Sequence, residues 1–407
     1  MPINLNIELR RTAPDTVVFN PGSLDRSTGT TGNEHFLVER IAPDRLIAVW
    51  TQSGYEGESN QQIVFSRSFD DGQTWSAAKV IAEADPERGV GMASWGFPVV
   101  SRSGRIYVFF SRHMGVNDFH THTAGRLSII KSDDQGDTWS EPVFLEMPRS
   151  IYDHADVNVP PNVIFWQKPL RLSHGRHFAG FTRWSTRSKE LESVVEFARF
   201  ENIDDDPDPA EVRITFFHAD ERALRLGARL QEPSIVPLPD GRLFCAMRTD
   251  LGYPAWTVSA DQGESWSPPQ PLRSHDGAEP FSHPLSPCPI YELVPGKFAF
   301  FYHHRPSSDL EGMRQRPYSA EFRRPICVAL GVFDPNADQP ITFSEPWYWM
   351  DNGGVSLLRT DFALYASSTP TAKGLMLWYP DRKFFLLGRR LDLAELEALP
   401  GVKFKSN

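Results

Sequence analysis

The chain has 407 residues, of which 40% are hydrophobic, 12% aromatic and 23% charged, and its 34 prolines and 28 glycines make it rich in turn-forming residues, which excludes a coiled coil and a disordered chain. Forty-two Lys and Arg residues against 52 Asp and Glu residues give a formal charge of −10 without a basic tract, so no nucleic-acid partner is expected. The sequence has no uncharged run of about 18 residues and no apolar signal-peptide core, so we expect no membrane partner and a cytoplasmic protein, or a secreted one whose leader has been removed.

The predicted elements repeat along the chain. A turn followed by an alternating apolar run, which predicts a β-hairpin, occurs six times, at residues 42–50, 102–111, 173–183, 239–248, 295–304 and 372–379. The turns at Asp44 and Gly374 are 330 positions apart, so the mean repeat is 66 residues. Six units of about four short strands arranged radially form an all-β, six-bladed β-propeller, which we expect to be a single domain over residues 1–407.

A few segments stand outside this repeat. Residues 3–11 or 16–20 are expected to supply the strand that closes the ring on the last blade. Residues 392–399 show the best helical pattern, and the polar stretch 201–213 predicts an exposed loop with at most a short helical turn.

A second motif, Ser-x-Asp-x-Gly-x-[Ser/Thr]-Trp, occurs at residues 68–75, 132–139 and 259–266. Its Asp can accept backbone N–H groups across a tight turn, its Gly permits a positive φ, and its Trp buries a large ring beside the turn. Three copies at one repeat position indicate a structural role, so Asp70, Asp134 and Asp261 are left out of the candidate site.

These three motifs resemble the Asp-boxes of the sialidase (neuraminidase) superfamily, whose members are six-bladed propellers, and the resemblance covers nearly the whole chain. Residues 232–244, 260–266 and 377–390 are similar to uncharacterised sialidase-like proteins of bacterial carbohydrate-degrading loci. The Asp-box implies the architecture, whereas several activities share it.

A propeller presents its functional groups at one end of its axis, where the inner strands converge. The expected beginnings of these strands carry acids, histidines and tyrosines, and arginines follow near the ends of the next strands. This mixture suits an anionic sugar. The residues are Glu34, His35, Trp95, Gln167, Lys168, Glu232, His283, Tyr291, Asp361 and Tyr365, followed by Arg112, Arg183, Arg248 and Arg305.

The resemblance implies roles for four residues. Glu232 matches the base that activates a nucleophilic tyrosine, and Tyr365 matches that nucleophile. Arg248 and Arg324, the latter with Arg323 as rival, match arginines that bind a substrate carboxylate. A phenol with a pKa near 10 is a weak nucleophile, so we expect the carboxylate base and the guanidinium charges to favour its ionised form. A tyrosine nucleophile is a known exception to the two-carboxylate rule for glycosidases.

The first blade departs from the sialidase pattern. The Arg-Ile-Pro motif is absent, and Glu34 or His35 stands at its place. An acid/base carboxylate is expected on the following loop, where Glu56 and Glu58 are the candidates.

Several histidines and acids remain open. His120 and His122, two positions apart, fit a substrate-contacting or catalytic loop, a metal pair or a solvated loop; because no third ligand is identifiable, no metal and no cofactor are expected. Asp153 fits a substrate contact or an Asx turn. His283, His303 and His304 face the axis or belong to the core. Residues 378–385 are expected to pack at the last blade around a turn network of Tyr379, Asp381 and Arg382.

The sequence thus predicts an enzyme with an arginine-rich pocket that binds an anionic carbohydrate. The first hypothesis is a sialidase-like glycoside hydrolase acting on an acidic or deoxy-sugar-containing glycan, with Tyr365, Glu232 and Glu58 or Glu56 as its catalytic residues. The alternatives are a polysaccharide lyase, which eliminates at a uronate and produces an ultraviolet-absorbing sugar, and a non-catalytic carbohydrate- or protein-binding propeller.

Overall fold

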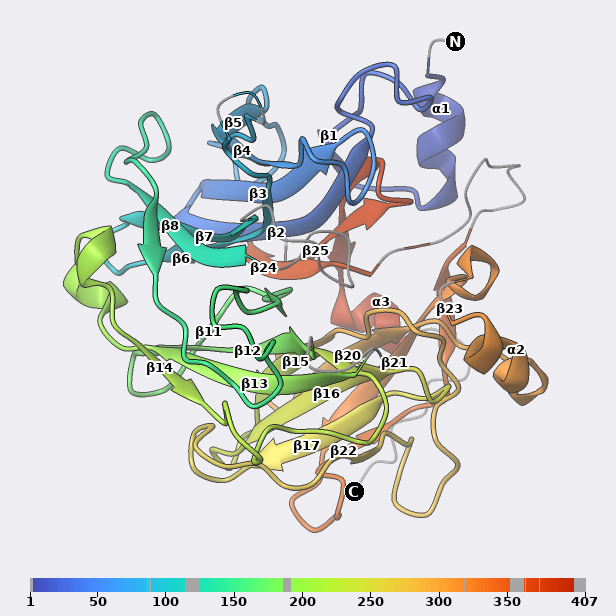
Figure 1. Cartoon of the computed structure of the whole chain (residues 1–407). Helices are drawn as coiled ribbons and strands as arrows, with labels where there is room; N and C mark the ends of the chain where they lie inside the picture. The colour runs from blue at the N-terminus through green and yellow to red at the C-terminus, as the bar shows by residue number, and fades with distance from the viewer. Residues whose placement is uncertain are drawn as a thin grey trace.

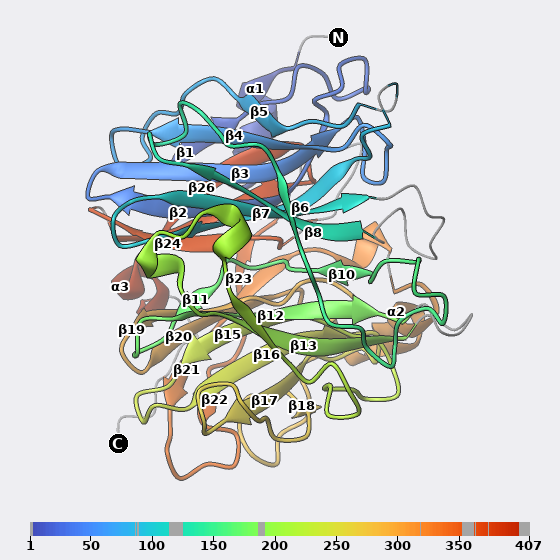
Figure 2. The ribbon, with the colours of Figure 1, turned by 60° about the vertical axis from the view of Figure 1, so that its left-hand side comes forward.

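The computed structural model describes residues 3–85, 87, 89–113, 125–185, 192–317, 319–351, 362, 364–372 and 374–398. Its strands form six antiparallel sheets of four or five strands. In Figure 1 the colour runs once around the ring, from the blue first sheet through green and yellow to the red last sheet beside the first. Figure 2 shows the same sheets from another side. The fold is the six-bladed β-propeller that the sequence predicts.

The first three blades follow one another along the chain. The first contains β2 (Gly32–Ala42), β3 (Arg45–Ser53), β4 (Gln62–Ser68) and β5 (Lys79–Ala82). The second contains β6 (Ala93–Val100), β7 (Ile106–His113), β8 (Gly125–Ser132) and β9 (Val143–Leu145). The third contains β10 (Val163–Ile164) and β11 (Leu170–Arg171), which both pair with β12 (His177–Trp184), and then β13 (Ser193–Phe200) and β14 (Ile214–Phe217).

The last three blades complete the ring. The fourth contains β15 (Leu230–Pro237), β16 (Leu243–Thr249), β17 (Ala255–Ser259) and β18 (Gln270–Pro271). The fifth contains β19 (Ile290–Val294), β20 (Lys297–Tyr302), β21 (Ile326–Phe333), β22 (Ile341–Phe343) and β23 (Trp347–Met350). The sixth contains β24 (Ser367–Thr371), β25 (Gly374–Asp381), β26 (Phe385–Leu391) and, from the other end of the chain, β1 (Thr16–Phe19).

Strand β1 closes the ring by pairing with β26, so the second of the two closing segments proposed from the sequence is correct. The first forms α1 (Leu5–Glu8) and η1 (Leu9–Arg11) instead. The expected C-terminal helix is α3 (Leu393–Glu397), whose N-cap Asp392 accepts two backbone N–H groups. The other helical turns are short: η3 (Ile203–Asp205), η4 (Pro209–Glu211), η5 (Ser307–Asp309), α2 (Leu310–Gln315) and η6 (Ala320–Phe322). No helix in the described part of the chain has the length and apolar character that crossing a bilayer requires.

The core lies between the blades. Six clusters of buried apolar side chains each combine two neighbouring sheets, and one of them joins the first blade to the last through Trp50 and Trp378. Apolar burial is the main stabilising contribution to a fold of this kind. The ring is therefore held by its interfaces, and each inner strand has a fixed position around the axis.

The Asp-boxes stabilise these interfaces. In the second blade Asp134 accepts the Thr138 N–H at 2.8 Å and the Thr138 hydroxyl at 2.6 Å, and the other two boxes repeat the pattern. Gly136 has a φ of 90°, and a Cβ there would lie 2.3 Å from the Phe65 ring of the first blade. These carboxylates therefore fix turns that pack on the preceding blade, as the repeated pattern predicts.

Candidate functional site

Three inner strands share a backbone distortion at the same end of the propeller. His35, Trp95 and Glu232 have left-handed φ angles of 54°, 55° and 53°, and each lies where the pairing register of β2, β6 or β15 shifts. A non-glycine residue in this region costs free energy, and a bulge re-aims the side chain it carries. The three side chains converge: the His35 ring lies 6.2 Å from Trp95 and 5.5 Å from Tyr365.

Two of these bulges are held by the neighbouring blade. The Glu232 N–H donates to the hydroxyl of Thr182 on β12 at 2.8 Å, and the Trp95 N–H donates to the hydroxyl of Thr51 on β3 at 2.8 Å. A buried N–H group without a partner is costly, so each threonine stabilises the bulged conformation of the next blade. The direction of the Glu232 side chain is thus set by a contact between blades.

Glu232, Arg248 and Tyr365 form a closed triangle of hydrogen bonds. The Tyr365 hydroxyl donates to Glu232 Oε1 at 3.0 Å, and Arg248 donates from one nitrogen to Glu232 Oε1 at 2.7 Å and to the Tyr365 oxygen at 3.1 Å. Arg248 lies opposite Gln231, the neighbour of Glu232, across the β15–β16 hairpin, whereas Tyr365 precedes β24 in the last blade. The geometric condition on which the sequence-based hypothesis depends, that Glu232 and Tyr365 can share a proton, is met.

The charge state of Tyr365 differs from the sequence-based expectation. Burial and the charge of Glu232 raise the pKa of Tyr365 to about 12, and Arg248 and Lys383 offset only part of this rise. The phenol is therefore neutral at neutral pH, not ionised. Glu232 Oε1, which accepts the hydrogen bond of the phenol, is the group positioned to receive its proton.

A second set of charges faces Tyr365 from the first blade. The Lys383 ammonium contacts Glu34 at 3.1 Å and also pairs with Glu56, and it lies 4.9 Å from the centre of the Tyr365 ring. Gln61 donates to the other oxygen of Glu34 at 2.9 Å. The Glu34–Lys383–Glu56 cluster therefore lies against Tyr365 on the first-blade side.

Protonation within this cluster is shared unequally. Burial and the charge of Glu56 raise the pKa of Glu34, to which Glu56 is hydrogen-bonded. Burial alone would raise the pKa of Glu56 too, but the Lys383 charge outweighs it and lowers that pKa. Burial likewise opposes the charge of Lys383, yet the two carboxylates raise its pKa. A proton on this pair therefore resides on Glu34, and Glu56 carries the negative charge.

The two acid/base candidates have separate positions. Glu58 accepts the backbone N–H groups of Gly54 at 2.7 Å and Tyr55 at 3.2 Å, so its carboxylate closes the β3–β4 loop on itself. Glu56 lies in the Lys383 cluster, and its charge is close enough to affect the pKa of Tyr365. Of the two, only Glu56 is placed to act on a group bound against Tyr365.

The sequence does not predict Lys383 as a site residue, because residues 378–385 are expected to pack at the last blade around a turn. Arg382 and Lys383 both have a φ of 57° and form the turn between β25 and β26. Asn33 of the first blade donates its N–H to the Lys383 carbonyl at 2.7 Å. The signal that could have indicated Lys383 is the position of this turn, which lies beside the first blade once the ring closes.

The predicted arginines divide between the cavity and its surroundings. Arg324 pairs with Asp351 at 3.2 Å, whereas the rival Arg323 donates to the Leu285 carbonyl at 2.8 Å and its charge acts on Glu56, His283 and His303. Arg323 is therefore the more deeply buried of the two, and Arg324 is held by its ion pair with Asp351.

Arg183 and Asp153 are not placed for substrate contact. Arg183 pairs with Asp153 at 2.8 Å and with Glu196 at 2.8 Å, and all three side chains have 1% exposure or less. The expectation that Arg183 and Asp153 bind substrate is therefore wrong. Their buried charges of opposite sign neutralise one another inside the third blade.

The histidines line or support the site. His283 and His303 stack with ring centres 5.9 Å apart, the His303 N–H donates to His283 at 3.1 Å, and burial lowers their pKa values to about 4 and about 3. Burial and the Lys383 charge lower the pKa of His35 to about 3. These three rings are neutral at physiological pH. His304 lies against Tyr302, and His120 and His122 fall outside the described residues.

The other axial residues separate two hollows. Gln167 donates to the Tyr291 hydroxyl at 3.2 Å and to the Ala366 carbonyl at 2.9 Å, and Tyr291 donates to the same carbonyl at 2.7 Å. Gln167 and Tyr291 also line a hollow of about 600 Å³ that opens at the opposite end of the axis. In this hollow Lys168 pairs with Glu39 at 3.0 Å.

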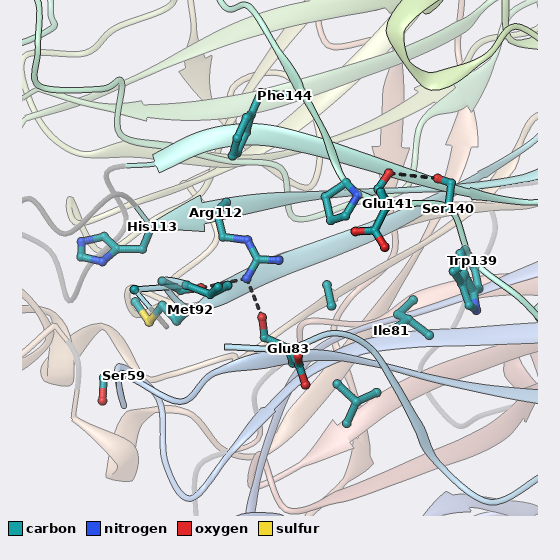
Figure 3. A pocket seen from close by; sticks show the side chains of 16 residues that line it. Ser59, Ile81, Glu83, Met92, Arg112, His113, Trp139, Ser140, Glu141 and Phe144 are labelled. Carbon is teal, nitrogen blue, oxygen red and sulfur yellow. Dashed lines mark hydrogen bonds between the residues drawn. The ribbon is translucent and has the colours of Figure 1, made fainter. Parts of the chain in front are cut away.

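A larger cleft, of about 900 Å³, lies between the first and second blades (Figure 3). Arg112, expected near the axis, lies in this cleft and donates to the carbonyls of Glu83 and Gly91. Its guanidinium therefore joins the two ends of the β5–β6 loop.

Comparison with solved structures identifies the architecture. The intramolecular trans-sialidase from Ruminococcus gnavus, in complex with oseltamivir carboxylate, aligns with a TM-score of 0.63 at 14% identity over 95% of this chain and 99% of that one. A protein of unknown function from Dyadobacter fermentans aligns with a TM-score of 0.60 at 12% identity over 93% and 97%. The Trypanosoma rangeli sialidase in complex with sialic acid aligns with a TM-score of 0.59 at 13% identity over 94% and 58%.

These identities establish a shared fold, while the sequence itself matches a family model. A comparison with curated protein sequences finds no match. The model of the BNR repeat-like domain matches residues 44–362, which is most of the chain. The chain therefore belongs to the BNR repeat-like family and has its sialidase-like, six-bladed propeller.

Proposed function

We propose that the protein is a glycoside hydrolase that removes a terminal sugar with Tyr365 as nucleophile and Glu232 as its base. The observation that carries the proposal is the hydrogen bond from the Tyr365 hydroxyl to Glu232 Oε1 at 3.0 Å, inside a buried triangle with Arg248. Its fold relatives include sialidases crystallised with sialic acid or oseltamivir carboxylate, which supports a glycan as the partner.

The first step joins the sugar to the tyrosine. The Tyr365 oxygen attacks the anomeric carbon as Glu232 takes the phenol proton, and the bond from that carbon to the leaving oxygen breaks. The proton shared by Glu34 and Glu56 passes through Glu56 to the leaving oxygen, so that the leaving group departs as an alcohol. Arg248 stays hydrogen-bonded to both Tyr365 and Glu232 and holds the pair in line.

The second step releases the sugar. Glu56, now a carboxylate without the shared proton, takes a proton from a water molecule, and the resulting hydroxide attacks the anomeric carbon. The bond to Tyr365 breaks, and Glu232 returns its proton to the phenol oxygen. Both carboxyl groups end in their starting states, and a two-step displacement of this kind retains the anomeric configuration.

The experiment is Tyr365→Phe, which removes one hydroxyl. With a panel of fluorogenic glycosides and acidic oligosaccharides, we expect kcat to fall by about a thousandfold or more, since the nucleophile is lost, while the melting temperature changes little. Tyr379→Phe is the matched control, because Tyr379 is a buried tyrosine of the same blade that packs in the core away from the triangle.

Three outcomes would contradict the proposal. Wild-type turnover in Tyr365→Phe excludes this nucleophile. Formation of an ultraviolet-absorbing unsaturated sugar by the wild type indicates elimination, as in a lyase. Binding of a glycan without turnover of any member of the panel indicates a carbohydrate-binding propeller.

A further inference from the structure

A small hollow lies beside the Glu34–Lys383–Glu56 cluster, whose Lys383 ammonium lies over the Tyr365 ring. It has a volume of about 200 Å³, and its polar lining comprises Arg26, Asn33, Glu34, Tyr55, Glu56 and Lys383. Because a water molecule occupies about 30 Å³ of liquid, the hollow has room for about six waters, or for a substituent of several heavy atoms on a bound sugar. Glu56 is half-exposed, with 47% of its side chain accessible, so the cluster is open to a ligand.

Most polar atoms of this wall are already engaged by the protein. Asn33 accepts from Trp50 at 3.0 Å and from Gln52 at 2.9 Å, and its amide donates to the carbonyls of Thr30 and Phe384, both at 2.8 Å. Gln61 occupies one oxygen of Glu34. The groups of the cluster that can still meet a ligand are therefore the half-exposed carboxylate of Glu56 and the ammonium of Lys383.

A carboxylate and an ammonium side by side favour a hydroxyl group. An ammonium has three N–H donors and no acceptor, and an ionised carboxylate only accepts, so one sugar hydroxyl can donate to Glu56 and accept from Lys383 at the same time. A sugar carboxylate at the same place would meet the negative charge of Glu56, which already pairs with the Lys383 ammonium, while Glu34 takes a second N–H donor of that ammonium.

Two guanidinium groups on the triangle side of the ring each have protein partners. Arg248 donates to Glu232 and Tyr365, and Arg323 donates to the Leu285 carbonyl. A free planar fork is what makes arginine a carboxylate binder. The Glu34–Lys383–Glu56 cluster, which faces Tyr365, contains an ammonium in place of such a fork.

We propose that the Glu34–Lys383–Glu56 cluster is a hydroxyl-binding subsite that selects a neutral aldose, rather than a carboxylate-bearing sugar, for the position against Tyr365. This inference rests on the proposed function only for the position of the sugar. It departs from the anionic glycan that the sequence predicts, because Lys383, which joins Glu34 to Glu56, was not part of that prediction.

Arg26 is the rival residue for an acidic ligand. Its guanidinium lies over the Tyr55 ring with 4.5 Å to the ring centre, at the mouth of the same hollow. Arg26→Ala removes a positive charge from the hollow without touching the cluster, which makes it the matched control for changes within the cluster.

The test measures binding with pairs of probes that differ in one carboxylate. The pairs are the methyl glycosides of glucose and glucuronic acid, of galactose and galacturonic acid, and of N-acetylneuraminic acid and its carboxyl methyl ester. Tryptophan fluorescence reports binding, because two tryptophans lie near Tyr365. The Trp166 ring contacts the Tyr365 ring directly, and the Trp95 ring contacts His35, which in turn contacts Tyr365. In every pair that binds, we expect the neutral member to bind the wild type at least tenfold more tightly.

Variants then assign the preference to the cluster. Glu56→Gln removes the negative charge at a half-exposed position and should reduce the preference to less than threefold, whereas Arg26→Ala should leave it at tenfold or more. The proposal is overturned if the acidic member binds as tightly as the neutral one, if Glu56→Gln leaves the preference unchanged, or if no probe binds.

Binding and turnover separate this inference from the proposed function. Tight binding of neutral probes without hydrolysis of any glycoside overturns the proposed function and leaves the subsite standing. Hydrolysis confined to acidic glycosides overturns the subsite and leaves the hydrolase.

Discussion

The fourth-blade and first-blade walls of the cavity use the same backbone device for different chemistry. In both, a bulge at the start of an inner strand holds one residue in a left-handed conformation, Glu232 in β15 and His35 in β2. The fourth-blade wall finds its partner Arg248 in its own hairpin, whereas the first-blade wall receives Lys383 from a turn 349 residues away. The repeat therefore fixes where side chains point, and contacts between blades decide what they do.

The largest expected effect concerns the cation of each wall. Arg248→Met leaves the buried Glu232 without its charged partner, and we expect the free energy of unfolding to fall by about 3–5 kcal/mol, as in other broken buried pairs. Lys383→Met should cost less, about 1–3 kcal/mol, because Glu56 is half-exposed and Glu34 can keep a proton. Urea denaturation at neutral pH measures both.

Conservative variants show whether charge or packing is responsible. Arg248→Lys and Lys383→Arg keep the charge and should each restore part of the lost stability. An equal loss of stability in the two methionine variants would mean that the two walls are equally closed to solvent. That outcome would contradict the exposed fraction of the Glu56 side chain.

A smaller effect is expected at the threonines that hold the bulges. Thr182→Val and Thr51→Val each leave a buried N–H group, that of Glu232 or of Trp95, without an acceptor, which should lower the free energy of unfolding by about 1–3 kcal/mol. The two differ in activity: Thr182→Val frees the base and should lower kcat about tenfold, while Thr51→Val should leave kcat within about twofold. Melting curves and steady-state kinetics on the same preparations check both parts.

This pair of variants is its own control, because the substitutions, the hydrogen-bond lengths and the blade positions match. Equal losses of kcat would show that the bulges act on activity only through general stability. An unchanged kcat in Thr182→Val would show that Arg248 and Tyr365 suffice to orient Glu232.

The sequence predicts what is local or periodic in this molecule. The 66-residue repeat indicates the six blades, and the Glu232 and Arg248 positions follow from one hairpin. Thr182 and Arg183 show where this ends: they are consecutive in β12, and strand alternation sends one hydroxyl to the next blade and the other side chain into a buried ion-pair network. No pattern in the sequence says which face is which.

Lys383 is a different case, since its role depends on ring closure. Its neighbours in sequence form a β-turn, and this local reading is correct. Its partners Glu34 and Glu56 come from the first blade, and only the meeting of the last blade with the first brings them within reach. Contacts of this kind cannot be predicted from the sequence, because neither Glu34 nor Glu56 belongs to a recognisable motif.

The smallest expected effect tests protonation in the first-blade wall. The pKa of Glu34 is raised in the folded state by burial and by Glu56, so between the unfolded value of about 4.3 and the higher folded value the native protein holds a proton that the unfolded chain has lost. Wild-type stability therefore falls as the pH rises through this window. The lowered pKa of Glu56 acts in the opposite sense, but its stabilisation is complete above about pH 5 and adds no slope beyond it.

Glu34→Gln removes the titrating group and keeps its shape. Its free energy of unfolding relative to wild type should rise between pH 5 and pH 8, by about 1.4 kcal/mol for each pKa unit by which folding raises the pKa of Glu34 within that window. Denaturant titrations of both proteins at the two pH values measure the shift. A difference that does not change with pH would show that Glu34 has the same charge folded and unfolded. Glu56 would then have to carry the shared proton itself, and a carboxyl group held neutral beside Lys383 would no longer repel an acidic sugar.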